Sequence, residues 1–327
     1  MKVLITGITG MVGSHLAEYI LNRHPKVEVH GLLRWRSPLE HIQPFKEKLK
    51  LHYGELRDLN SLILLFREVR PDWIFHLAAQ SYVLTSFAAP VDTLQTNIIG
   101  TANLLDAVRL SGIDPKIHVC SSSEVYGQVR PEEIPIKENN PFRPASPYAV
   151  SRVGEDMMAY QYFVSYGIKT VCTRMFTHTG PRRGDVFAES SFAKQIAEIE
   201  AGLRKNPVRV GNLESLRTVA DVRDAVHAYW LLMEKCPAGE VYNIGGSRTL
   251  AVGEILEILK GLAYCKIEHQ IDRALLRPSD VTLQIPDLTK FQKATGWKPE
   301  IPLETTLQDL LQYHRDRIKN MPGALIR

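Results

Sequence analysis

The sequence predicts an α/β protein with a doubly wound, parallel Rossmann-type sheet and a smaller α/β substrate-binding region at the C-terminus. Three observations support this fold class. Short runs rich in β-branched residues alternate with amphipathic helical patterns through the first 175 residues. A glycine-rich loop directly follows the first of these runs. The length of 327 residues corresponds to about two folding units, or one large α/β unit.

The first half of the chain is predicted to alternate strands and helices with right-handed crossovers. Val12, Leu16 and Ile20 recur at helical spacing behind the first strand and predict a helix over residues 12–22. Asp58 is the expected N-cap of the next helix. The predicted strands cover residues 3–6, 27–33, 50–52, 73–77, 117–120 and 170–174, and further helices cover residues 91–111 and 147–165.

The second half has a looser pattern. A basic turn at residues 181–184 is followed by helical patterns at residues 188–201, 221–235, 252–262 and 303–318. We therefore expect a dinucleotide-binding Rossmann domain at residues 1–176. Residues 177–327 are expected to form a nucleotide-sugar capping region, with some elements returning to the first domain.

Composition and charge exclude several classes of protein. Forty basic and 36 acidic residues give a net charge of +4, and no polybasic block indicates a nucleic-acid or membrane partner. The four cysteines form no C-x-x-C spacing and the histidines no ligand spacing, so we expect no metal site and no disulfide framework. With no apolar run of about 18 residues, the sequence predicts a reduced cytoplasmic protein.

A glycine loop lies between the first strand and the first helix. Residues 6–13 read TGITGMVG, a G-x-x-G-x-x-G spacing. Glycines at this junction allow a tight turn and a close approach of the backbone to a pyrophosphate, and the helix N-terminus supplies free N–H groups. The loop therefore predicts a dinucleotide site, with a purely structural turn as the alternative.

The end of the second strand indicates which dinucleotide binds. An NAD-selective site places an acidic residue there for the ribose hydroxyls. Residues 31–37 read GLLRWRS instead, with Arg34 and Arg36 but no acid. Arginine suits a 2′-phosphate through charge-assisted hydrogen bonds. We therefore predict NADP, with NAD as a possibility, and the alternative is that both arginines are solvated loop residues.

A tyrosine and a basic residue are expected to share one helix face. Tyr148 and Arg152 are four residues apart at the start of the helix after a proline-rich loop. A fixed cation favours the phenolate form, so Tyr148 is a candidate general acid or base. Ser122 and Glu124 follow the strand at 117–120, where ligands meet a parallel sheet. Ser122 could hydrogen-bond a substrate oxygen and Glu124 could transfer a proton.

These motifs resemble those of the extended short-chain dehydrogenase/reductases, most specifically the nucleotide-sugar branch. Within it the chain resembles the GDP-mannose 4,6-dehydratases and, less closely, the GDP-4-keto-6-deoxymannose reductases. The supporting segments are LAAQS at residues 77–81, PRRGDVF at 181–187, FAKQI at 192–196, GNLESLR at 211–217 and RPSDV at 277–281. In the dehydratases, the loop that 181–187 resembles reaches a neighbouring subunit's cofactor.

The resemblance implies a set of site residues. The implied catalytic residues are Ser122, Glu124, Tyr148 and Arg152. The implied cofactor-binding residues are Gly7, Thr9, Gly10, Met11, Val12, Gly13, Arg34, Arg36, Glu55, Leu56, Leu77, Ala78, Ala79, Tyr148, Arg152, His178 and Arg183. The implied substrate-binding residues are Gln80, Ser81, Ser122, Ser123, Glu124, Thr177, Lys194, Asn212, Arg217, Arg277 and Asp280.

The resemblance also implies a reaction and an assembly. Tyr148 would take the proton of the sugar C4 hydroxyl, Ser122 would stabilise the C4 oxygen, and Glu124 would remove the C5 proton and help expel the C6 hydroxyl. The product would be a GDP-4-keto-6-deoxy sugar. The family also implies a homodimer or homotetramer, in which helices such as 91–111 and 147–165 pair across subunits.

Three residues depart from the family pattern. Arg152 stands where lysine is usual, Thr177 where asparagine precedes the histidine, and Thr218 where an acid follows Arg217. Arginine keeps the charge but cannot join a proton relay as lysine can. Two alternatives therefore stay open beside the dehydratase: an NAD(P)H-dependent C4 reductase, and a low-activity nucleotide-sugar binder.

Overall fold

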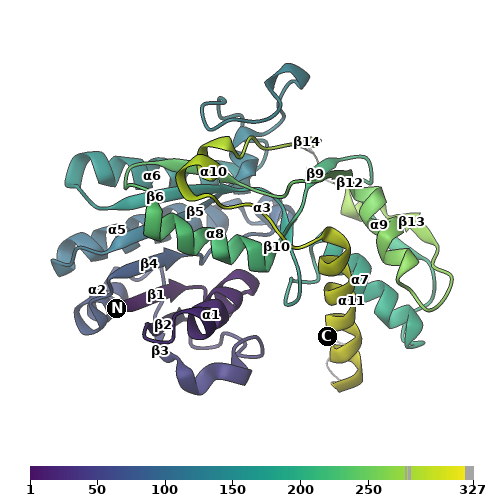
Figure 1. The fold of residues 1–327 in the computed structure, drawn as a ribbon, viewed down its shortest axis with the longest axis horizontal. Coiled ribbons are helices and arrows are strands. Elements are labelled where there is room, and N and C mark those ends of the chain that lie inside the picture. Colours follow the sequence, from purple (N-terminus) through teal and green to yellow (C-terminus); the bar gives the residue numbers. More distant parts are fainter. Residues whose placement is uncertain (277, 279–280, 321–327) are drawn as a thin grey trace.

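Seven parallel strands form the central sheet of the computed structural model, which describes residues 1–276, 278 and 281–320 (Figure 1). Their order is β3-β2-β1-β4-β5-β6-β11, so the direction of winding reverses between β1 and β4. This order confirms the predicted Rossmann-type fold, in which ligands bind at the reversal point. The strands are β1 (Lys2–Thr6), β2 (Glu28–Leu33), β3 (Lys50–Tyr53), β4 (Trp73–His76), β5 (Lys116–Ser122), β6 (Thr170–Met175) and β11 (Val241–Ile244).

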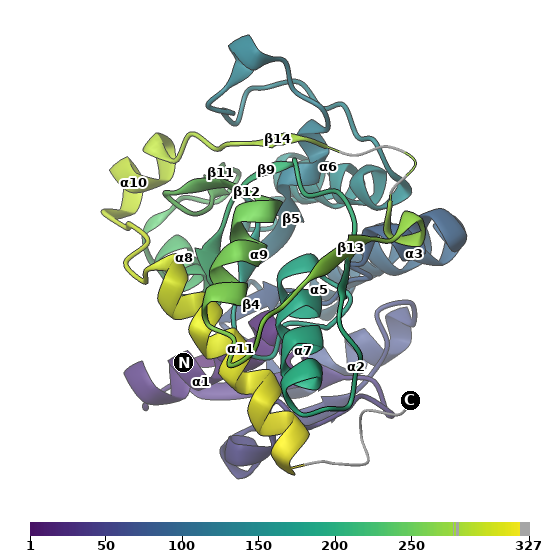
Figure 2. The same ribbon diagram turned by 90° about the vertical axis from the view of Figure 1, so that its right-hand side faces the viewer.

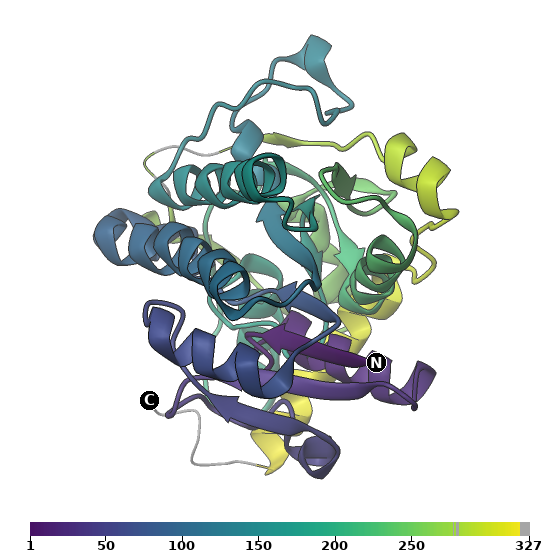
Figure 3. The ribbon, with the colours of Figure 1, turned by 90° about the vertical axis from the view of Figure 1, so that its left-hand side faces the viewer.

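Helices cover both faces of this sheet. On one face α1 (Met11–Arg23) packs against α8 (Val222–Lys235), and on the other lie α2 (Leu59–Val69), α5 (Gly100–Ser111) and α6 (Pro147–Tyr166) (Figure 3). Successive strand residues point to opposite faces. Leu4 accordingly packs into the cluster with Phe66, whereas Ile5 packs into the cluster with Leu16. Burial of both faces explains why the strands read as continuous apolar runs.

The helix predicted at residues 91–111 is divided in the structure. It consists of α4 (Pro90–Leu94), a π-helical turn η2 (Gln95–Ile99) and α5. Asn97 in the π turn is fully buried. Such π turns often occur at functional sites, and the hydrogen bonds of Asn97 described below give this one a role.

The C-terminal part of the chain surrounds a separate apolar cluster that includes Ile196, Leu256 and Leu310. Its helices are α7 (Ala188–Glu200), α9 (Val252–Gly261) and α11 (Leu303–Asn320), with α10 (Thr289–Thr295) nearer the sheet (Figure 2). Short strands complete it: β7 (His178–Thr179), β8 (Val208–Val210), β9 (Leu216–Thr218), β10 (Ala220–Asp221), β12 (Thr249–Ala251), β13 (His269–Ile271) and β14 (Leu283–Gln284).

Two elements that come after residue 176 lie with the first domain. β11 pairs with β6 at the edge of the central sheet, and α8 packs on α1. The second half of the chain therefore contributes both to the sheet and to the smaller part that faces the carboxyl ends of its strands (Figure 1).

Candidate active site

A cavity of about 780 Å³ lies where the carboxyl ends of the strands meet the C-terminal part. Most of the residues that the sequence singled out line its wall. They are Gly7, Thr9, Gly10, Met11, Val12, Gly13, Arg34, Glu55, Leu56, Leu77, Ala78, Ala79, Gln80, Ser81, Ser122, Ser123, Glu124, Tyr148, Arg152, Thr177, His178, Arg183, Asn212 and Arg217.

A few predicted site residues lie elsewhere. Arg36 does not line the cavity; it is exposed, with its guanidinium 5.2 Å from the centre of the exposed Trp35 ring. Lys194 lies in the wall of an adjoining smaller pocket, where its Nζ is 2.6 Å from Asp185 Oδ2. Arg277 and Asp280 lie outside the residues that the structure describes.

The glycine loop is shaped by close backbone packing. Gly7 has a φ of +69°, and a Cβ there would lie 2.9 Å from Ala78 Cα. A Cβ on Gly13 would lie 2.3 Å from the Gly7 carbonyl oxygen. α1 begins at Met11, within the glycine motif, and no side chain of the described residues caps its N-terminus. The free N–H groups of this first turn can therefore bind an anion that the glycines allow to approach.

Thr6 and His76 tie the glycine loop to the loop after β4. Thr6 Oγ1 accepts hydrogen bonds from the backbone N–H groups of Leu77 and Ala78, each at 3.1 Å, and lies 3.0 Å from His76 Nδ1. The other ring nitrogen of His76 lies 2.9 Å from Thr101 Oγ1. Complete burial lowers the pKa of His76 to about 3, so the imidazole is neutral at neutral pH.

Asn97 links that same loop to the helix that carries the tyrosine. Its amide accepts a hydrogen bond from Gln80 N at 2.8 Å and donates to Gln80 O at 3.0 Å and to Ser151 Oγ at 2.8 Å. Ser151 Oγ in turn donates to Tyr148 O at 2.7 Å. The sequence analysis missed Asn97; its only sequence signal is a polar residue on the inner face of an amphipathic helix.

The end of β5 places a serine and a carboxylate in the wall. Ser122 is the last strand residue and the N-cap of the short helix η3 (Ser123–Tyr126), with its hydroxyl accepting a hydrogen bond from Glu124 N at 3.2 Å. Ser123 Oγ donates to Gln284 Oε1, and Gln284 also lines the cavity. A residue more than 150 positions away could not be assigned to the site from sequence spacing.

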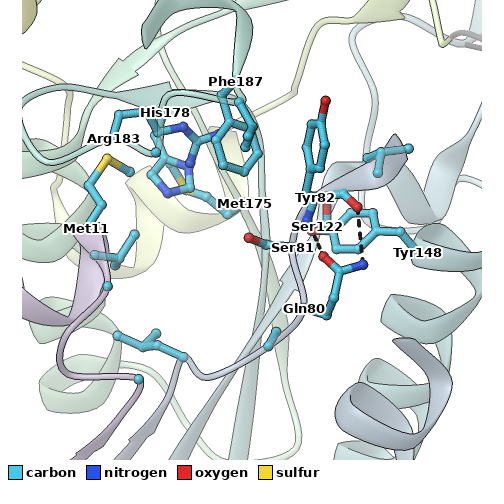
Figure 4. Close-up of a pocket in the computed structure, with 18 of the residues that line it drawn as sticks. Met11, Gln80, Ser81, Tyr82, Ser122, Tyr148, Met175, His178, Arg183 and Phe187 are labelled. Atoms are coloured by element: carbon cyan, nitrogen blue, oxygen red, sulfur yellow. Dashed lines mark hydrogen bonds between the residues drawn. The ribbon is translucent and has the colours of Figure 1, made fainter. Parts of the chain in front are cut away.

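Tyr148 lies in the first turn of α6, on the opposite wall from His178 (Figure 4). Ser146 caps the helix by accepting a hydrogen bond from Ala149 N at 3.0 Å, and Pro147 occupies the first helical position. Arg152 follows one turn later, with its guanidinium carbon 5.0 Å from the centre of the Tyr148 ring. Tyr148, Ser122 and Gln80 lie together in Figure 4, as an acid–base site for a hydroxyl or carbonyl requires.

His178 and Arg183 form the facing wall, beside Phe187 (Figure 4). The Arg183 guanidinium carbon lies 3.5 Å from the centre of the Phe187 ring. Burial lowers the pKa of both groups, and Arg183 helps to bring that of His178 to about 4. Among the described residues, His178 Nε2 and Arg183 Nε are buried without a hydrogen-bond partner. The neutral His178 ring donates from Nδ1 to the Phe176 carbonyl at 3.2 Å, so its Nε2 is an acceptor, whereas Arg183 Nε is a donor. This wall therefore offers a ligand one acceptor and one donor.

The basic turn at residues 181–184 packs against α1 of the same chain. Arg182 Nη2 lies 2.7 Å from Glu18 Oε2 on α1, and the Pro181 carbonyl lies 3.0 Å from His15 Nε2. The resemblance suggested a loop that reaches the cofactor of a neighbouring subunit. In this structure Arg183 lines the cavity of its own chain.

Thr177 and Thr218, two of the departures from the family pattern, have different surroundings. Thr177 lines the cavity. Thr218 is buried on β9, and its hydroxyl donates to the Gln284 carbonyl at 3.3 Å. Threonine thus serves a buried strand contact where an acidic side chain would be costly to bury.

Neither a metal cluster nor a membrane span is found in the part of the chain that the structure describes. There, no group of three or more His, Cys, Asp and Glu side chains is arranged to hold a metal ion. Across residues 1–276, 278 and 281–320, no helix has the length and apolar character needed to cross a bilayer.

A Rossmann sheet whose glycine loop, serine-rich strand end and Tyr-x-x-x-basic pair share one cavity defines an extended short-chain dehydrogenase/reductase. A family model described as GDP-mannose 4,6 dehydratase matches residues 4–310. The chain therefore belongs to the GDP-mannose 4,6-dehydratase family, and the resemblance inferred from the motifs is confirmed.

Individual relatives agree with this assignment. The GDP-mannose 4,6-dehydratase of Yersinia enterocolitica is 32% identical, with 95% of this chain and 92% of that protein covered. The GDP-6-deoxy-D-mannose reductase of Pseudomonas aeruginosa is also 32% identical, with 97% and 98% covered. The solved structure of RMD from Pseudomonas aeruginosa, complexed with NADPH, has a TM-score of 0.84 at 32% identity and covers 97% of this chain and 99% of that one.

Proposed function

We propose that this protein is an NADP-dependent GDP-hexose 4,6-dehydratase, a lyase that converts a substrate such as GDP-mannose into the GDP-4-keto-6-deoxy sugar. The observation that supports this best is that Ser122, Glu124 and Tyr148 line one cavity, with Tyr148 across from His178 and Arg183 in Figure 4. The family match and the dehydratase relatives agree with this choice. A cytoplasmic location, expected from the cysteine pattern, is part of the proposal.

The chemistry follows from the positions of these groups. A bound nicotinamide would accept a hydride from C4 and return it to C6. Tyr148 would take the proton from the C4 hydroxyl, and Ser122 would hydrogen-bond the C4 oxygen. Glu124 would remove the C5 proton and deliver a proton to the departing C6 hydroxyl, which leaves as water. After the hydride returns to C6, C5 would take up a proton, and the proton that Tyr148 took from the C4 hydroxyl balances this uptake. Overall the sugar loses one water and is neither oxidised nor reduced.

The cavity suits a dinucleotide cofactor. A Cβ on Gly13 would collide with the Gly7 carbonyl oxygen, so glycine there keeps the turn tight enough for a pyrophosphate to approach the backbone. On the facing wall, Arg183 Nε offers a donor and His178 Nε2 an acceptor that no described residue uses. Arg34, at the end of β2 where an NAD site would carry an acid, lines the cavity. We therefore assign the 2′-phosphate of NADP to Arg34.

The two arginines after β2 give a matched pair of variants. Arg34→Ala should weaken NADP binding about 10- to 100-fold, the loss of one charge-assisted hydrogen bond, and leave NAD binding within a factor of about two. Arg36→Ala is the control and should change neither, because Arg36 stacks on Trp35 outside the cavity. Titration calorimetry with both cofactors measures this. Equal losses of NADP affinity in the two variants would contradict the assignment of the 2′-phosphate to Arg34.

A single incubation tests the reaction. The protein is mixed with GDP-mannose and catalytic NADP, without added reductant, and the products are identified by mass spectrometry and NMR. A 4-keto-6-deoxy product without net NADPH consumption supports the dehydratase. Turnover only of a GDP-4-keto-6-deoxy sugar, with NADPH consumed, means that the reductase function is correct. Binding without either reaction means that the protein is a nucleotide-sugar binder.

One observation favours the C4 reductase as the second candidate. The alignment with the Pseudomonas reductase spans 318 positions and covers 97% of this chain, so it is nearly free of gaps. The alignment with the Yersinia dehydratase needs 350 positions to cover 95% of the chain. This chain therefore lacks segments that the dehydratase carries. In the reductase reading Tyr148 would donate a proton to the C4 oxygen instead of taking one.

We also propose that the protein is a homodimer through α6 and its neighbours. Val150, Met157 and Val164, which recur two turns apart along α6, are exposed, as are Val91 on α4 and Ile99 on η2. Both elements pack beside α6 (Figure 3). We therefore assign these exposed side chains to one surface. An apolar surface of this kind suits a second copy of the chain.

The proposed dimer face can be broken by one charge. Met157→Glu should convert the protein to a monomer in light scattering after size-exclusion chromatography, because a carboxylate would be buried in the apolar contact. Leu64→Glu, at an equally exposed apolar residue of α2, is the control and should leave the mass unchanged. A monomeric native protein would exclude the dimer.

A further inference from the structure

Two buried ion pairs lie next to each other along α6. Arg174 on β6 pairs with Asp156 through two hydrogen bonds, of 2.7 Å and 3.1 Å. Arg152 pairs with Glu155 through one, from Nη1 to Oε2, at 2.7 Å. The Glu155 side chain is 1% exposed and that of Arg152 8%. Burial of charges on this scale is stabilising only when every polar atom is satisfied.

The pair of Arg152 and Glu155 does not meet that condition. Arg152 Nη1 also donates to the Cys120 carbonyl at 2.8 Å, at the end of β5. However, Arg152 Nε and Glu155 Oε1 are buried and have no hydrogen-bond partner among the residues that the structure describes. Burial raises the pKa of the Glu155 carboxyl to about 7 against the opposing effect of Arg152. A costly, incompletely satisfied pair beside a catalytic tyrosine suggests a functional role.

Glu155 is the carboxylate that compensates Arg152. Asp156 is already held by Arg174, and within the described residues Arg152 makes its ion pair with Glu155 alone. The other titratable groups that interact electrostatically with the pair are His76 from β4, Cys120 from β5, Cys172 from β6, Tyr229 from α8, and Tyr148 and Asp156 from α6 itself. None of these brings a second unpaired carboxylate to Arg152.

We propose that Glu155 is a positioning residue for the acid–base step: it holds Arg152 against the end of β5 and offsets the positive charge that the guanidinium presents to Tyr148. The proposal rests on the proposed acid–base function of Tyr148. It also explains how arginine can occupy this place, because the carboxylate three residues later anchors the longer, planar side chain.

The sign of the effect follows from the charges. Glu155→Gln keeps an oxygen that can accept from Arg152 but removes the negative charge, so the cation beside Tyr148 is no longer offset. The phenolate form of Tyr148 is then favoured, and its ionisation moves to lower pH by about one unit, the shift expected for one nearby charge. The matched control is Asp156→Asn, in the neighbouring ion pair, which should lower stability without moving that ionisation.

The test is a spectroscopic titration that needs no substrate. Phenolate absorbance is recorded against pH for each chain and for the same chain carrying Tyr148→Phe, and the difference isolates Tyr148. A shift to lower pH in Glu155→Gln, absent in Asp156→Asn, supports the proposal. An unchanged titration in folded Glu155→Gln overturns it. A shift in a protein that does not convert GDP-mannose would leave the role of Glu155 standing while the proposed function fails.

A second variant tests the proposal if Glu155→Gln does not fold. Replacing a buried ion pair by apolar residues is commonly tolerated, so Arg152→Met combined with Glu155→Leu should fold. Without the pair, the cation and its counter-charge are lost together, so the Tyr148 ionisation should stay close to that of the native protein. A shift to higher pH by about one unit or more would mean that Arg152 acted on Tyr148 without an offset from Glu155, and would overturn the proposal.

Discussion

Tyr148→Phe is expected to lower kcat for the conversion of GDP-mannose about a thousandfold, the usual contribution of a positioned general acid or base. The ring that packs at the start of α6 is kept, and only the hydroxyl that exchanges a proton with the C4 oxygen is removed. Burial of the residue, at 7% exposure, means that water cannot readily replace that hydroxyl. Steady-state kinetics over a range of pH measures the loss.

The comparison variant for this experiment is Tyr160→Phe, on the same helix but exposed. It loses the same hydroxyl and should keep full activity. Tyr160→Phe should also leave the cofactor dissociation constant unchanged, because Tyr160 does not line the cavity. If Tyr148→Phe retained more than about a tenth of the native kcat, Tyr148 would not be the acid–base group.

Glu124→Gln is expected to stop dehydration while leaving the first oxidation possible. The amide cannot take the C5 proton or protonate the leaving hydroxyl, so kcat for the 4-keto-6-deoxy product should fall by about 100- to 10,000-fold. Oxidation at C4 depends on Tyr148 and Ser122 instead. With GDP-mannose and NADP, the variant should therefore accumulate reduced nicotinamide up to one equivalent per site, seen by its absorbance.

Glu132→Gln, at an exposed glutamate of the loop after η3, serves as the control and should behave like the native protein. A Glu124→Gln variant that still formed the deoxy product at the native rate would remove Glu124 from the mechanism. Loss of C4 oxidation together with dehydration would mean that Glu124 acts before the elimination step, which the proposed sequence of proton transfers does not allow.

The fold could be predicted because its signals are local. The strand β1, the loop that ends at Gly13 and the helix α1 follow one another within 23 residues, and each has its own pattern. The wall residues of the βα loops were found for the same reason, since the carboxyl end of a parallel strand is identifiable from sequence. Arg34 and Tyr148, for example, line the cavity.

The parts of the fold and of the site that could not be predicted depend on contacts between distant segments. Gln284 reaches Ser123 across 161 residues, and Asn97 acts through a π turn that the helical pattern hides. β11 carries the buried polar Asn243, whose side-chain amide donates to the Ile136 carbonyl at 2.8 Å. Because of this polar residue, the sequence of β11 does not resemble the apolar runs of the other strands in the sheet. The positions of Arg36, in a loop, and Lys194, on α7, also required tertiary structure, because the sequence does not indicate which way a long charged side chain points.

The place of β11 at the edge of the central sheet has a consequence for how the chain folds. Residues 1–176 contain the whole glycine loop and the helix that carries Tyr148. However, one edge of β6 stays unpaired until residues 241–244, which form β11, have been synthesised. α8 likewise covers α1 from more than 200 positions away. Such pairings of distant segments slow folding and make it cooperative. We therefore expect the cofactor half and the substrate half to fold together as one unit, after residues 241–244 have been synthesised. Neither half is expected to fold on its own.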